Sequence, residues 1–117
     1  MNYIKKRLLS FKWAFKGLFD LLMNHPNVKI HLLASIVAIG LSVYFNISSV
    51  EWCIIILSIV LVISLEAMNS ALEYLTDLAS PEQHPLAGKA KDIAATAVLV
   101  AAMGTVAVAA FIFIPKI

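Results

Sequence analysis

The chain has 117 residues, of which 62% are hydrophobic and 14% are charged, and its formal net charge is +2. A soluble domain is about half apolar and a quarter charged, and so short a chain could not bury this much apolar surface in its own core. The composition therefore excludes a water-soluble globular protein. It predicts a single all-α membrane domain over residues 1–117, because lipid offers the backbone no hydrogen-bond partners. The one cysteine, Cys53, excludes a disulfide within the chain.

Residues 3–24 have the pattern of an amphipathic helix. Large apolar side chains recur at helical spacing and alternate with lysines: Leu8, Leu9, Phe11, Phe15, Leu18, Phe19 and Leu22 with Lys5, Lys6, Lys12 and Lys16. Such a helix lies in the membrane surface with its basic residues toward anionic lipid. We expect it either to anchor the chain or to act as a gate for a molecule entering sideways from the bilayer. A secretory signal is not expected, because no short apolar core precedes a small-residue cleavage site.

Three apolar segments follow. We predict transmembrane helices over 28–47, 50–79 and 85–114, since about 20 apolar residues cross a bilayer core. The middle segment has a shorter apolar run, 52–65, but nothing breaks a helix before the polar extension ends. Basic residues gather before the first span and in the 78–92 loop, so the positive-inside rule places both in the cytoplasm.

The second span carries a polar face. Glu66, Asn69, Glu73 and Asp77 are spaced i, i+3, i+7 and i+11, which sets them along one side of a helix. Insertion scales charge about 2.5–3.5 kcal/mol for an acid at the centre of a span, so an intramembrane acid indicates a functional site. Two plainer interpretations remain open. Glu66 could be a protonated acid bonded to a neighbouring helix, and Asp77 could sit at the solvated end of a long helix.

The loop before the third span supplies the opposite charge. Its charged and titratable side chains are Glu82, His84, Lys89, Lys91 and Asp92. A helix that begins at Pro81 or Pro85 would expose free amides there, and amides with lysines form a place for phosphate. Carboxylates opposite could hold Mg²⁺, which takes oxygen ligands and usually bridges to substrate phosphates. The alternative is that the lysines only set topology, which we favour for Lys89. The chain has no P-loop and no Gly-rich nucleotide fingerprint.

The stretch EAMNSALEYLTDL (66–78), followed by HPLAGKAKDIAATAVL (84–99), closely resembles the bacterial membrane diacylglycerol kinase family, which also contains undecaprenol kinases. The E-x-x-N-[ST]-A-x-E-x-x-x-D pattern and the A-K-D motif at 90–92 are specific at this spacing. The resemblance extends over nearly the whole chain, including NVKIH (27–31). It implies a homotrimer of three-span subunits in the bacterial inner membrane. Each subunit would have an amphipathic surface helix and share active sites with its neighbours.

The resemblance also implies an activity, the transfer of the γ-phosphoryl group of ATP to a lipid hydroxyl with Mg²⁺. It makes Glu66 the base on that hydroxyl with Asn69 beside it, and Glu73 a Mg²⁺ ligand. The residues implied near ATP are Lys6, Trp13, Glu73, Glu82, His84, Lys91 and Asp92. One departure concerns the metal, because relatives usually place a glutamate, the second ligand, where this chain has His25. Magnesium prefers oxygen over imidazole nitrogen, so we expect a raised Mg²⁺ requirement.

The acceptor lipid stays open between diacylglycerol, which would give phosphatidic acid, and undecaprenol. The HPLA segment at 84–87 is more typical of the undecaprenol kinase relatives. The competing class is a non-catalytic membrane-assembly or proton-relay subunit, and a third possibility is a relative that has lost activity, suggested only by His25. The Lys91–Asp92 pair beside a helix start favours the kinase, since a proton relay needs no such pair. We expect the bilayer, the lipid, ATP and further copies of the chain as partners, and no nucleic acid.

Overall fold

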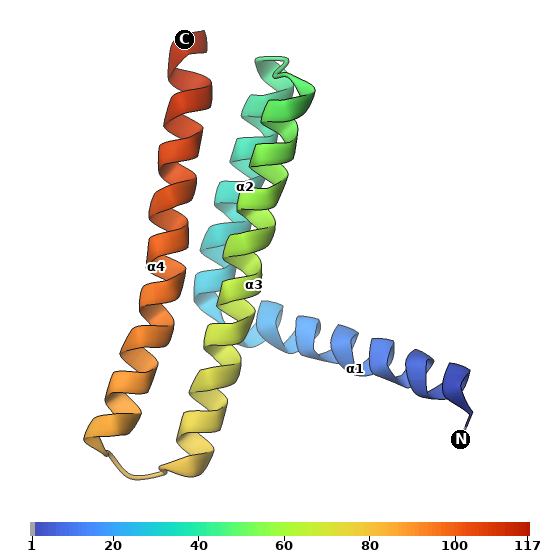
Figure 1. Ribbon diagram of the computed structural model, residues 1–117, viewed down its shortest axis with the longest axis vertical. Helices are drawn as coiled ribbons and strands as arrows, with labels where there is room; N and C mark the ends of the chain where they lie inside the picture. The colour runs from blue at the N-terminus through green and yellow to red at the C-terminus, as the bar shows by residue number, and fades with distance from the viewer. Residues whose placement is uncertain (1) are drawn as a thin grey trace.

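The computed structural model describes residues 2–117 as an all-helical chain (Figure 1). Its elements are α1 (Tyr3–Asn24), α2 (Pro26–Tyr44), α3 (Ser49–Ala79), α4 (Pro85–Phe113) and a short 3₁₀ turn η1 (Ile114–Lys116). The three later helices stand side by side along the long axis, while α1 projects away from them to one side (Figure 1). The predicted class, three long apolar helices after an N-terminal helix, is confirmed.

All three later helices are long and apolar enough to cross a membrane. Their large apolar side chains mostly face outward, as in Phe111 at 82% exposed and Leu57 at 68%. Outward apolar side chains suit lipid, which is as apolar as they are. The 31 residues of α3 extend for about 45 Å at about 1.5 Å per residue, which exceeds the roughly 30 Å hydrocarbon core. One end of α3 must therefore emerge from the apolar layer.

The helix boundaries have local causes. α2 begins at Pro26, where the missing N–H costs nothing, and ends at Tyr44 just before Asn46, whose φ of 50° is left-handed. α3 begins with a capping box, in which Ser48 Oγ accepts from the Glu51 N–H and a Glu51 carboxylate oxygen accepts from the Ser48 N–H, both at 3.1 Å. α4 begins at Pro85.

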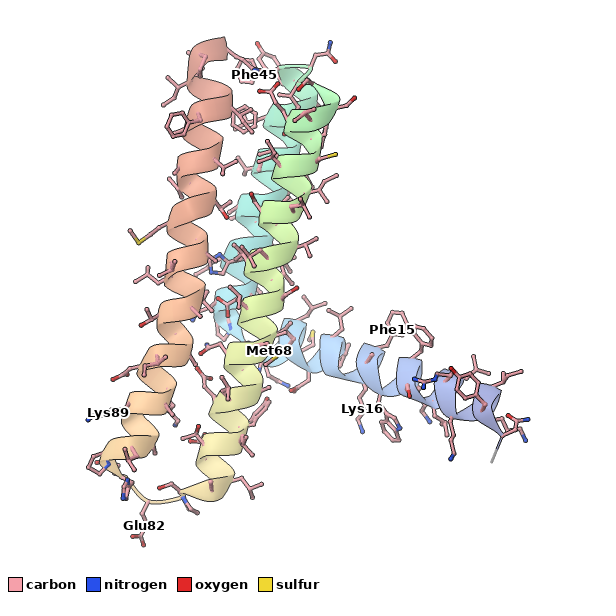
Figure 2. The ribbon with its side chains drawn as sticks, in the orientation of Figure 1. Phe15, Lys16, Phe45, Met68, Glu82 and Lys89 are labelled. Atoms are coloured by element: carbon pink, nitrogen blue, oxygen red, sulfur yellow. The ribbon has the colours of Figure 1, made fainter. Side chains whose placement is uncertain are left out.

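The two ends of the bundle differ in packing. At the end where α2 turns into α3, a cluster of buried side chains forms, made of Ile47, Ile55, Ile112 and Phe113. There, Lys116 Nζ lies 2.9 Å from a carboxylate oxygen of Glu51 and ties the C-terminus to the start of α3. Figure 2 shows Phe45 at this end and Glu82 and Lys89 at the opposite end. We call the end with the buried apolar cluster the closed end of the bundle, and the end with the α3–α4 loop the open end.

α1 has two chemically different sides. Figure 2 shows Phe15 and Lys16 pointing to opposite sides of the helix. Only its last residues pack on the bundle, with Leu21 buried. The greater part of α1 thus presents an apolar side and a basic side away from the other helices.

Candidate functional site

Glu66 lies inside the bundle on α3, with only 3% of its surface exposed. Its Oε1 atom is 3.0 Å from Nε2 of His31 on α2. Both side chains line a cavity of about 210 Å³ whose remaining polar residues are Asn27 and Asn69, and whose α4 wall is apolar. A buried carboxylate is costly without a polar partner, and the His31 imidazole lies in contact with it. The cavity therefore holds a carboxylate in a mostly apolar setting.

Asn69 lies one turn further along α3 and is 8% exposed. Its Nδ2 donates to a carboxylate oxygen of Glu73 at 3.3 Å, a contact between residues four apart on the helix. Its Oδ1 is buried and has no hydrogen-bond partner among residues 2–117. A buried acceptor left unpaired costs about 1–3 kcal/mol. This oxygen is therefore suited to a donor or a cation that comes from outside the chain.

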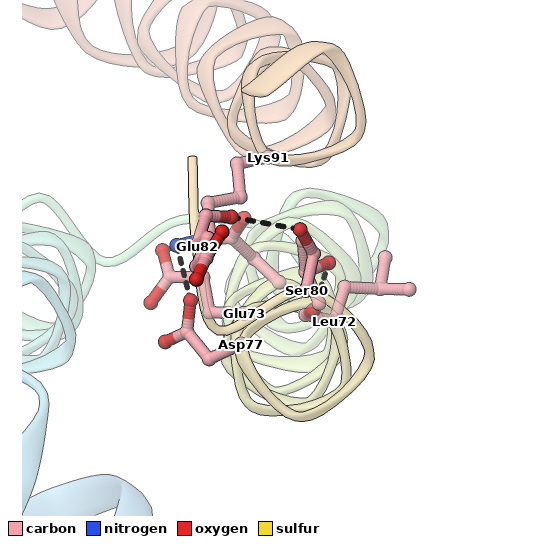
Figure 3. Close-up of polar contacts among 8 residues, drawn as sticks. Leu72, Glu73, Asp77, Ser80, Glu82 and Lys91 are labelled. Carbon is pink, nitrogen blue, oxygen red and sulfur yellow. Dashed lines mark hydrogen bonds and ion pairs between the residues drawn. The ribbon is translucent and has the colours of Figure 1, made fainter. Parts of the chain in front are cut away.

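A second cavity, of about 610 Å³, lies at the open end between α3, the connecting loop and the start of α4. Its charged and titratable lining residues are Asp77, Glu82, His84 and Lys91. The ammonium of Lys91 meets the carboxylate of Asp77 across the two helices (Figure 3). The volume lies within the roughly 300–1,000 Å³ of ordinary ligand sites. Asp92 follows Lys91 as an exposed residue of α4.

Glu73 connects the two cavities along α3. It is four residues after Asn69 and four before Asp77, so the three side chains share one side of the helix at intervals of about 6 Å. Glu73 is half-buried, and the Asn69 amide holds one of its carboxylate oxygens. The polar side of α3 thus runs from the buried Glu66 to the exposed Asp77–Lys91 pair.

His25 belongs to a different polar group, at the elbow between α1 and α2. Its Nε2 lies 3.0 Å from the Tyr74 hydroxyl oxygen, and that hydroxyl donates to a carboxylate oxygen of Asp20 at 2.9 Å. The Asn24 amide donates to the other oxygen of Asp20. These hydrogen bonds, that of Asn24 first and that of Tyr74 second, hold the pKa of the Asp20 carboxyl below its usual value. We call His25, Tyr74, Asp20 and Asn24 the elbow network.

The donor chemistry near Glu73 suits Mg²⁺ in part. Among residues 2–117, no three His, Cys, Asp or Glu side chains cluster as a ready metal site. Mg²⁺ is usually bound by one or two carboxylates plus phosphate oxygens and waters, however. Glu73 can supply one carboxylate, and the unpaired Asn69 oxygen lies next to it. His25 offers an imidazole whose Nε2 is already bonded to Tyr74.

Lys6 and Trp13 belong to α1, the helix that extends away from the bundle (Figure 1). Trp13 is 57% exposed, and its ring has the ammonium groups of Lys12 and Lys16 at 5.6 and 5.3 Å from its centroid. One subunit therefore gathers Glu66, Asn69 and Glu73 along α3 but leaves Lys6 and Trp13 away from the cavity that contains Lys91.

The sequence interpretation did not assign a role to His31, Tyr74 or Asp20. Each makes a polar contact with a residue 35 to 54 positions away in the chain. No spacing rule connects residues so distant in the chain. The sequence offered one signal for His31: a histidine inside an apolar span is costly without a polar partner.

Helices able to cross a membrane, together with a buried carboxylate near a charged cavity, define a multi-pass membrane protein with a polar site at one end of its bundle. The family description of prokaryotic diacylglycerol kinase matches residues 12–113, and the chain belongs to this family. It is therefore a lipid kinase, a phosphotransferase that uses ATP, and the predicted family and enzyme class are confirmed. Membership of a kinase family argues against the alternative of a non-catalytic membrane-assembly or proton-relay subunit.

Individual relatives carry two names. The chain is 34% identical over 116 residues to an undecaprenol kinase of Bacillus subtilis (strain 168), covering 99% of this chain and 94% of that protein. It is 30% identical over 89 residues to a diacylglycerol kinase of Escherichia coli (strain K12), covering 76% and 73% of the two chains. A diacylglycerol kinase of Synechocystis is 32% identical over 111 residues, and the match spans 63% of that longer protein.

Proposed function

We propose that the chain transfers the γ-phosphoryl group of ATP to the hydroxyl of undecaprenol at the cytoplasmic side of the bacterial membrane. The observation that carries the reaction type is the buried Glu66 carboxylate in an apolar cavity, on the same side of α3 as the charged cavity at the open end. The undecaprenol acceptor is supported by the similarity to the Bacillus enzyme over nearly the full length of both chains. The HPLA segment at 84–87 supports it as well.

Diacylglycerol is the second candidate acceptor. It is favoured by the family description and by the names of the Escherichia and Synechocystis relatives. Both lipids present a hydroxyl at the membrane interface, so the chemistry below serves either one.

Glu66 acts as the general base. Its carboxylate takes the proton of the lipid hydroxyl while the hydroxyl oxygen attacks the γ-phosphorus, and the bond from that phosphorus to the bridging oxygen of ADP breaks. The apolar walls from α4 keep bulk water away from the attacking oxygen. Asn69 orients the hydroxyl next to Glu66, which is a use for its buried, unpaired Oδ1 atom.

The nucleotide occupies the cavity at the open end. Lys91 and Asp92, with Glu82 and His84 of the loop, contact ATP there. The ammonium of Lys91 exchanges its exposed partner Asp77 for phosphate oxygens, which charge-assisted hydrogen bonds favour. Glu73 would hold Mg²⁺, which supplies positive charge against the transferring phosphoryl group.

Lys6 and Trp13 complete the ATP site from a neighbouring subunit of a homotrimer. This part of the proposal is supported by the single subunit, in which α1 carries both residues away from the nucleotide cavity (Figure 1). A shared site between copies brings such separated residues together. The outward small residues of α4, among them Ala95 and Gly104, allow close helix approach in such an assembly.

The proposed orientation places α1 and the α3–α4 loop in the cytoplasm, where ATP is available. It is supported by the basic residues of α1 and of the 85–92 segment, which outnumber the single Lys116 near the other end. α1 lies along the membrane surface, supported by its opposed apolar and basic sides (Figure 2).

A direct assay tests the function. Purified protein in detergent micelles receives radiolabelled ATP and Mg²⁺ with undecaprenol or diacylglycerol in separate reactions, and the Bacillus and Escherichia relatives serve as positive controls. We expect label in undecaprenol. Label in diacylglycerol alone reassigns the acceptor, and label in neither lipid, where the relatives work, contradicts the kinase activity.

A further inference from the structure

The side chain opposite Glu66 is a histidine from another helix. His31 Nε2 lies 3.0 Å from Glu66 Oε1, and their side chains are 22% and 4% exposed. They are the only titratable residues that line the 210 Å³ cavity, since Asn27 and Asn69 are amides and the rest are apolar. The Glu66 carboxylate thus has a direct polar contact from outside its own helix, the His31 imidazole.

The backbone of α2 places His31 on the side of the helix that faces the bundle. Val28, three residues earlier, is fully buried, and Ser42, eleven residues later, is also fully buried. Residues at these spacings share one side of a helix. Because α2 is packed through this side, the imidazole meets Glu66 as part of the fold.

The contact with His31 distinguishes the two carboxylate oxygens of Glu66. An ionised carboxylate only accepts, and an imidazole Nε2–H can donate to it. His31 Nε2 lies against Oε1, and this contact does not involve Oε2. One oxygen is therefore held in place, and the other is left for a hydroxyl that enters the cavity.

We propose that His31 is a positioning residue of this kinase, which through its contact with Oε1 keeps the Glu66 carboxylate turned toward the lipid hydroxyl. This inference rests on the proposed role of Glu66 as the base. In the reaction step, the O–H bond of the lipid breaks and its proton moves to Glu66 Oε2. The oxygen lone pair forms the new bond to the γ-phosphorus, and the electron pair of the broken P–O bond leaves on ADP. His31 gains and loses nothing in this step.

Two substitutions separate the polar contact of His31 with Glu66 from the volume of the His31 ring. His31→Phe keeps a ring of similar size without a donor, and His31→Gln keeps an N–H donor on a flexible chain. For His31→Phe we expect kcat to fall about 10- to 100-fold, the range for a lost polar contact to a charged group. The KM for ATP stays within about twofold, because His31 lies outside the nucleotide cavity. For His31→Gln we expect a kcat within about fivefold of the unmodified chain.

Further variants connect the effect to Glu66. In a Glu66→Gln background, which removes the base, His31→Phe should cause no additional loss of the residual rate. Each variant is compared by gel filtration in detergent and by its thermal midpoint, so that a loss of assembly is recognised. Where the phenylalanine ring prevents assembly, His31→Leu replaces it with the same expected loss.

The outcomes distinguish this inference from the proposed function. If Glu66→Gln keeps substantial activity, the base assignment falls and the role of His31 falls with it. If Glu66→Gln is inactive while His31→Phe keeps its kcat, only the role of His31 is overturned. Equal losses in assembled His31→Phe and His31→Gln also overturn it, because the N–H donor would then make no difference.

Discussion

The Nε2 atom of His25 lies 3.0 Å from the hydroxyl oxygen of Tyr74, and the two rings meet edge to face with their centroids 5.3 Å apart. This contact ties the start of α2 to α3 at the residue next to Glu73. Position 25 is where the sequence predicts a second metal ligand. In this chain its side chain is an imidazole bonded to Tyr74, so the proposed Mg²⁺ site would have one carboxylate fewer.

The first prediction concerns the histidine that stands at position 25 in place of a glutamate. His25→Glu should lower the Mg²⁺ concentration needed for half-maximal kinase activity several-fold, because a carboxylate is a better magnesium ligand than an imidazole. The measurement is a Mg²⁺ titration of the rate at saturating ATP and lipid. Tyr74→Phe is the matched control, since it frees His25 without supplying an oxygen and should leave the requirement unchanged. An unaltered requirement in His25→Glu would remove position 25 from metal binding.

Glu66 and Glu51 provide a test of the base on one helix. Glu66→Gln should lower kcat by at least about 100-fold, since general bases contribute roughly 10²–10⁴-fold. Glu51 pairs with Lys116 at the closed end of the bundle, so Glu51→Gln should have the kcat of the unmodified chain. Single-turnover and steady-state rates in the same micelles provide the comparison. Comparable losses of kcat in both variants would argue that Glu66 supports the folded structure and is not the base.

Two lysines of α4 allow a comparison between a residue proposed to bind phosphate, Lys91, and a residue expected only to set topology, Lys89. Lys91 lines the cavity at the open end, whereas Lys89 has no ion-pair partner among residues 2–117 and lies outside that cavity. Lys91→Met should raise the KM for ATP about tenfold or more, the cost of a lost charge-assisted contact. Lys89→Met should change it less than twofold. The idea fails if the two substitutions have equal effects on the KM for ATP.

The elbow network should respond to acid. The pKa of Asp20 is lowered by hydrogen bonds from Asn24 and Tyr74, so the folded state favours the ionised form. The stabilisation is therefore present above the ordinary aspartate value of about 3.9 and is lost as the pH falls through the lowered pKa. A spin label at Ser10 should become more mobile below about pH 4 as α1 loosens. In Asp20→Asn this acid-dependent step should be absent, and a step of equal size would rule out Asp20 as its source.

The capping box at the start of α3 gives a stability prediction. Ser48→Ala removes the acceptor for the Glu51 N–H and should cost about 1 kcal/mol of unfolding free energy. The kcat at 25 °C should stay the same, because this end is far along α3 from Glu66. Ser58→Ala is the control, since the Ser58 hydroxyl only bonds the Ile54 carbonyl within the helix. Denaturation in mixed micelles measures both variants, and an equal loss in each would contradict a specific cap.

The apolar segments and the polar breaks between them were enough to predict three long spans after an amphipathic helix. Lipid offers the backbone no hydrogen-bond partners, so an apolar span of this length forms a helix. The spacing of Glu66, Asn69, Glu73 and Asp77 was also enough to align them, because a helix converts sequence spacing into direction by local geometry alone. Only the tertiary structure decided the partners: His31 for Glu66, Tyr74 for His25 and Asp77 for Lys91. Those pairs join different helices, and their meeting depends on how each helix is rotated and how far it is shifted against its neighbours. Rotation and shift result from packing summed over whole helix faces, which no local spacing in the chain records.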